Sequence, residues 1–91
     1  MNKIGYIVQF YDEDSVSPHG TGKELFRRFE DALQYANTLA KTWLEKEYAP
    51  VEGAYELLTP SENNVINRIS GLVFRCAQIL VWIEVIYEKL G

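Results

Sequence analysis

The first segment of the chain alternates between apolar and other residues. Over 3–11, apolar side chains recur at every second position, at Ile4, Tyr6, Val8 and Phe10. The intervening positions are Gly5, Ile7, Gln9 and Tyr11. A period of two with β-branched and aromatic residues is typical of a β-strand. The pattern therefore predicts a strand over 3–11, which ends at the acidic residues that follow it.

One amphipathic helix is predicted downstream. Apolar residues recur there at spacings of three and four, at Phe29, Ala32, Leu33, Ala36, Leu39, Ala40, Trp43 and Leu44. Polar residues occupy the remaining positions, so the helix carries a single apolar stripe. Pro50 and Gly53 are expected to end it. We expect the stripe to pack on a sheet, with Leu33 and Leu39 supplying main core contacts.

The start of this helix has two interpretations. Thr21 and Glu24 have the spacing of a capping box, which favours a helix from about residue 22. The segment from Lys23 also alternates, which favours a short strand at 23–26 and a helix from about 28. A helix over 22–48 would be about 40 Å long at 1.5 Å per residue, so we prefer the second interpretation. The sequence leaves the choice between a strand and a helix start over 22–27 open.

The C-terminal half contains strand patterns. The segments 54–59 and 78–88 are predicted as strands, the second being the strongest in the chain. Between them, 65–76 alternates like a strand, but its apolar spacing also fits a helix capped by Ser61. We interpret 65–76 as a strand because Gly71 and the β-branched residues disfavour a helix.

These elements predict one α+β domain over 1–91. It has a small, mostly antiparallel sheet of four or five strands, with one long amphipathic helix packed on one face. Such a helix covers only one side of the sheet. The last strand is nevertheless apolar on both faces, and a strand of that kind needs cover on both. If Val81, Ile83 and Val85 pack under the helix, an uncovered patch remains, formed by Leu80, Trp82 and Ile86.

Composition and charge exclude several classes of protein. The 91 residues contain nine Lys and Arg against thirteen Asp and Glu, for a net charge of −4. An acidic chain lacks the positive surplus that phosphate contacts need, so we do not expect nucleic-acid binding. Cys76 is the one cysteine, which excludes an intrachain disulfide and a Cys-rich zinc site. The longest apolar run, 79–83, is far below the roughly 20 residues of a membrane span, and we expect a cytoplasmic protein.

Few residues offer catalytic chemistry. The run from Gly20 to Lys23 resembles the end of a phosphate-binding loop, but Glu24 stands where the hydroxyl residue belongs, and we expect no cofactor. An enzyme would have to use His19, Asp12 and Asp14, in a site completed at an oligomer interface.

The favoured expectation is therefore a small non-catalytic interaction module, or a regulatory or accessory protein. It would form a homo-oligomer or bind a protein partner through Leu80, Trp82 and Ile86. The enzyme subunit and a nucleic-acid-binding protein are the alternatives. An enzyme subunit would lose activity when His19 or Asp12 is mutated, whereas an interaction module would keep its partner. A nucleic-acid-binding protein would show an affinity that falls steeply with salt.

Overall fold

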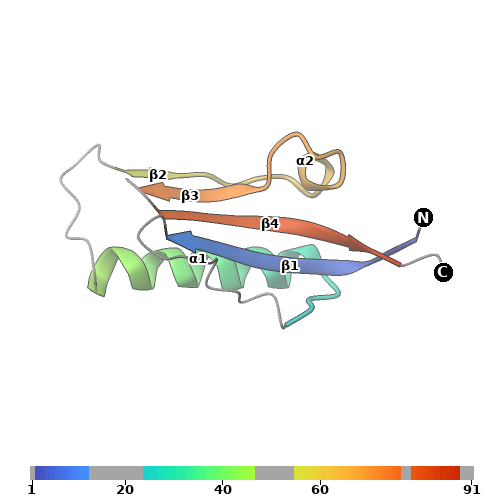
Figure 1. Ribbon diagram of the computed structural model, residues 1–91, viewed down its shortest axis with the longest axis horizontal. Helices are drawn as coiled ribbons and strands as arrows, with labels where there is room; N and C mark the ends of the chain where they lie inside the picture. The colour runs from blue at the N-terminus through green and yellow to red at the C-terminus, as the bar shows by residue number, and fades with distance from the viewer. Residues whose placement is uncertain (1, 13–23, 47–54, 77–78, 89–91) are drawn as a thin grey trace.

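Four strands form one antiparallel sheet in the order β1-β4-β3-β2, and a long helix packs on one of its faces (Figure 1). The computed structural model describes residues 2–12, 24–46, 55–76 and 79–88. The elements are, in chain order, β1 (Lys3–Asp12), α1 (Phe29–Lys46), β2 (Tyr55–Leu57), α2 (Glu62–Ile66), β3 (Leu72–Cys76) and β4 (Ile79–Tyr87). The predicted α+β class, with an antiparallel sheet and one main helix, is confirmed.

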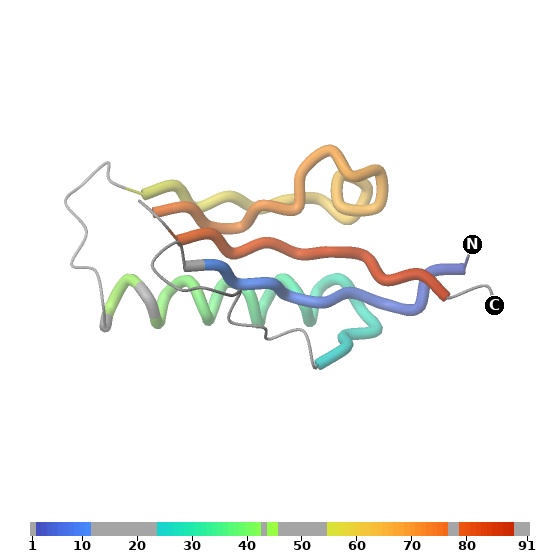
Figure 2. The backbone as a smooth tube through the Cα atoms, viewed as in Figure 1, coloured from blue at the N-terminus to red at the C-terminus, as the bar shows by residue number. Residues whose placement is uncertain are grey.

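The sheet is centred on the long pair formed by β1 and β4. Lys3 pairs with Tyr87, so the start of β1 and the end of β4 lie side by side (Figure 2). The alternation read from the sequence matches the burial, because Tyr6, Val8 and Phe10 are buried under α1. Ile4 is the exception at 45% exposure, since the register shifts between Lys3 and Gly5.

Helix α1 lies close to the sheet because small residues face it. Ala32, Ala36 and Ala40 are fully buried, whereas Leu33 and Leu39 are only partly buried beside them. Both leucines pack against the core as expected, but the residues of the stripe that are fully buried include the three alanines and not the leucines. An alanine row lets the helix backbone approach the strands, and the larger leucines flank the contact. Glu30 and Asp31 in the first turn also favour the helix, because acidic side chains interact well with its N-terminus.

A short extension of the sheet precedes α1. Phe26 exchanges two backbone hydrogen bonds with Tyr6, at 2.7 and 2.8 Å. This supports the strand interpretation of 23–26, of which residue 23 lies outside the described residues. Gly5 permits the approach, because a Cβ atom there would lie 2.5 Å from the carbonyl oxygen of Phe26.

The segment 65–76 is not one strand, and that prediction is wrong for its first half. The short helix α2 begins before it, with Ser61 as the N-cap whose hydroxyl accepts a hydrogen bond from the Asn64 backbone N–H. After α2 the chain turns through Arg68, which has a positive φ of 58°. Only Leu72–Cys76 pairs as a strand. The alternative, a helix capped by Ser61, is confirmed at its start, although α2 ends at Ile66 and does not continue through 76.

A bulge also changes the faces within β3. Alternation places Leu72 and Phe74 on the same face, but the register shifts between them. Phe74 is buried under α1, while Leu72 pairs with Trp82 on the opposite face of the sheet.

No helix in the described part of the chain is long and apolar enough to cross a membrane.

Candidate interaction surface

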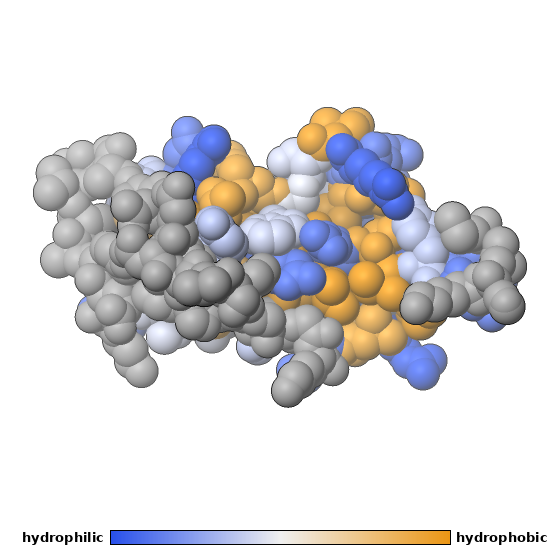
Figure 3. Space-filling model, in the orientation of Figure 1, coloured by the Kyte–Doolittle hydropathy of each residue, from blue (hydrophilic) through white to orange (hydrophobic). Residues whose placement is uncertain are grey.

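The face of the sheet opposite α1, here called the open face, carries partly exposed apolar side chains. In the described ranges no second helix covers it, and in Figure 1 β1 passes in front of α1. The central row across three strands is Gln9, Trp82 and Leu72, and the next row is Tyr11, Leu80 and Arg75. On the other side of Trp82, Ile7 pairs with Glu84 and Gly5 with Ile86. Figure 3 shows apolar and polar side chains interleaved on this face.

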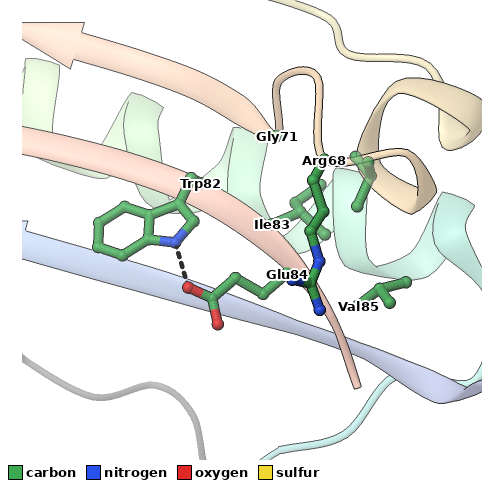
Figure 4. Close-up of a pocket in the computed structure, with 7 residues that line it drawn as sticks. Arg68, Gly71, Trp82, Ile83, Glu84 and Val85 are labelled. Atoms are coloured by element: carbon green, nitrogen blue, oxygen red, sulfur yellow. Dashed lines mark hydrogen bonds between the residues drawn. The ribbon is translucent and has the colours of Figure 1, made fainter. Parts of the chain in front are cut away.

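Trp82 lies at the centre of the open face and is partly exposed. Its indole N–H donates a hydrogen bond of 2.7 Å to Oε1 of Glu84 (Figure 4). The polar atom of the indole is therefore satisfied within the chain, which leaves the ring free to contact an apolar partner. An aromatic side chain of this kind is the usual anchor at the centre of a protein interface.

A hollow of about 350 Å³ adjoins Trp82 where β4 extends beyond the first residue of β3 and the loop after α2 passes beside β4. Arg68, Gly71 and Glu84 are among the residues that line it (Figure 4). The Arg68 guanidinium makes no ion pair and no hydrogen bond within the described ranges. It is thus a charge at the rim of the open face that is available to another molecule.

The opposite end of the open face carries a formed ion pair. Arg75 donates to Oε2 of Glu56 from Nε at 3.1 Å and from a terminal nitrogen at 2.7 Å. Both side chains are more than half exposed, so the pair is screened by water and contributes little to stability. Its charges remain accessible from the open face.

The predicted interface residues Leu80, Trp82 and Ile86 all lie on the open face and are all partly exposed. The sequence did not single out their neighbours Ile7, Tyr11 and Leu72, which extend the apolar surface over three strands. The alternation of the first strand carried the signal for Ile7 and Tyr11, because both fall opposite the buried Tyr6. The signal for Leu72 was hidden by the bulge.

The residues proposed for an enzyme site are not described. His19 and Asp14 lie outside the described ranges, as does the side chain of Asp12, which ends β1. No group of three or more His, Cys, Asp or Glu suited to holding a metal ion occurs among the residues that the structure describes.

A cluster of polar side chains joins β1, which is an edge strand of the sheet, to α2. The fully buried Tyr6 donates its hydroxyl hydrogen to Glu62, and Lys3 donates to the Tyr6 oxygen at 2.8 Å and to Glu62 at 3.2 Å. Burial, followed by the bond to Glu62, raises the pKa of Tyr6. A tyrosine held protonated in this way is a poor general base. The cluster fastens α2 to the sheet, and no sequence signal predicts it because Tyr6 and Glu62 are 56 residues apart.

The pH dependence of stability should report this cluster. Hydrogen bonds from Tyr6 and then Lys3 lower the pKa of Glu62 below its ordinary value of 4.5. A carboxyl whose pKa falls on folding stabilises the folded protein at every pH above its pKa in the unfolded chain. That contribution is lost as the pH falls through its pKa in the folded protein. Relative to Glu62→Gln, the wild-type protein should therefore be more stable at neutral pH, with the difference shrinking below about pH 4.5.

Urea unfolding of both proteins across acidic pH measures this difference. Glu45→Gln, which removes an exposed carboxylate on α1, is the matched control and should show a much smaller change with pH. An equal pH dependence for the two variants would contradict the assignment.

Comparison with known proteins gives no match: no family model fits the sequence, and no curated protein or solved structure is significantly similar to it.

Proposed function

We propose that this protein is a small non-catalytic interaction module that self-associates through the open face of its sheet. The observation that supports this most is the set of partly exposed apolar side chains that surround Trp82 on three strands, namely Ile7, Tyr11, Leu72, Leu80 and Ile86. Exposed apolar side chains that gather on one face of a sheet usually mark an interface.

A second copy of the chain is the partner that best fits the surface. Two-fold dimers are the commonest oligomers, and an isologous contact covers the same patch on both molecules at once. Two sheets packed face to face lie about 10 Å apart with interleaved side chains. In that arrangement each Trp82 would be buried by the partner's open face.

Sedimentation of the wild-type protein and of Trp82→Glu tests the proposal. The wild-type protein should sediment as a dimer at micromolar concentration, and Trp82→Glu should be a folded monomer. Loss of a central aromatic anchor costs about 2 kcal/mol or more, which is roughly thirtyfold in affinity, and the introduced charge adds to this.

Leu57→Glu is the matched control, because it places the same charge at an apolar position that is 50% exposed and lies on β2, away from the Trp82 row. It should remain dimeric. A wild-type protein that stays monomeric at high micromolar concentration would show that the open face is covered within the chain, and would overturn the proposal.

A further inference from the structure

The charges of the open face lie at two ends, on opposite sides of Trp82. Arg75 pairs in register with Leu80, two residues before Trp82 on β4, and Glu84 lies two residues after it. At about 3.3 Å per residue, both rows are about 7 Å from Trp82 along the strand. The Arg75 end also carries Glu56, and the Glu84 end also carries Arg68.

From this layout, and on the basis of the proposed self-association, we infer that two copies pack with their β4 strands antiparallel, so that Arg75 of each copy pairs with Glu84 of the other. Consider a two-fold axis that lies between the two sheets and runs perpendicular to β4 at Trp82. Rotation about it reverses the direction of β4 in the second copy and keeps β3 on the same side of β4. It therefore places the partner's Arg75 row over the Glu84 row.

The other simple axis, which runs along β4, gives an unfavourable contact. It leaves the strand direction unchanged, so that Glu84 faces Glu84 of the second copy. Like charges placed together at an interface cost free energy, whereas opposite charges fix the register of the two molecules. The distribution of charge thus selects the antiparallel dimer over the parallel one.

The hollow beside Glu84 lies where this arrangement requires space. The partner's Arg75 is on the strand next to β4, and the axis carries it to the side of β4 where the hollow opens, beyond the first residue of β3. The partner's Glu56 comes with it and meets Arg68, which has no ion pair among the described residues. Four charges of alternating sign then lie together at each of the two equivalent contacts, where the single chain has only the Arg75–Glu56 pair among its described residues.

Charge reversal tests the inference in the full-length protein. Glu84→Arg and Arg75→Glu should each weaken the homodimer about tenfold or more at low salt, because each creates two like-charge contacts per dimer. An equimolar mixture should form a heterodimer that is tighter than either homodimer, since both of its contacts are then between opposite charges. Fluorescence-detected sedimentation with one variant labelled measures all three affinities. Glu45→Arg, an equal charge change on α1, is the control and should behave as wild type.

The outcomes separate this inference from the proposed function. A monomeric wild-type protein overturns both. A wild-type dimer that is disrupted by Trp82→Glu, but is unaffected by the two charge reversals or shows no preference for the heterodimer, overturns the antiparallel pairing and leaves self-association through the open face standing. Circular dichroism confirms that each variant is folded.

Discussion

Val81→Glu is expected to leave the protein unfolded at room temperature, while Trp82→Glu, one residue along the same strand, leaves it folded. Val81 is fully buried and pairs in register with both Phe10 and Phe74 beneath α1. No polar or charged side chain of the described residues is buried there, so the new carboxylate would have no partner. An unpaired buried charge costs several kcal/mol, a large part of the roughly 5–14 kcal/mol expected for a domain of this length.

Far-UV circular dichroism and urea titration of the two variants measure this contrast. Trp82→Glu is the matched control, because it introduces the same charge into the same strand on the opposite face. A cooperative unfolding transition for Val81→Glu within about 1 kcal/mol of wild type would contradict the assignment of the two faces, since changes of that size are typical of surface positions.

Gly71→Ala is expected to lower the free energy of unfolding by roughly 2–4 kcal/mol, the sum of an overpacking cost and a lost hydrogen bond. An added Cβ would lie 2.2 Å from the carbonyl oxygen of Ile83, which is backbone and cannot rotate away. The strands would have to separate, which breaks the 2.8 Å hydrogen bond from the Ile83 N–H to the Gly71 oxygen. This is the point where β4 leaves β3 and the hollow beside Trp82 begins.

Thermal and urea denaturation measure the loss. Ile69→Ala, in the same loop, is the matched control, because Ile69 is 69% exposed and its truncation should change stability by less than about 0.5 kcal/mol. Equal stabilities for Gly71→Ala and Ile69→Ala would show that the close approach at Gly71 is absent in solution.

The sequence by itself determined the parts of the fold whose patterns are long. The alternation over 3–11 and 78–88 and the apolar stripe from Phe29 predicted β1, β4 and α1, because each runs for several periods of its own repeat. The same alternation predicted that Leu80, Trp82 and Ile86 share the face opposite Val81. Successive side chains of a strand point to opposite faces, so the residues that share a face can be predicted without knowing what the strand packs against.

Only the tertiary structure decided the features that depend on contacts distant in sequence. Helix α2 is about one turn long, and a hydrogen bond from the Tyr6 hydroxyl to Glu62 holds it against the sheet. The bulge between Leu72 and Phe74 depends on how β3 meets β4. The register of β3 against β4 placed Arg75 beside Leu80, on the opposite side of Trp82 from Glu84. Such features depend on contacts and pairing between distant segments, which the pattern of residues along the chain does not contain. The buried face of a long helix or strand, in contrast, is predicted by the period at which its apolar residues recur.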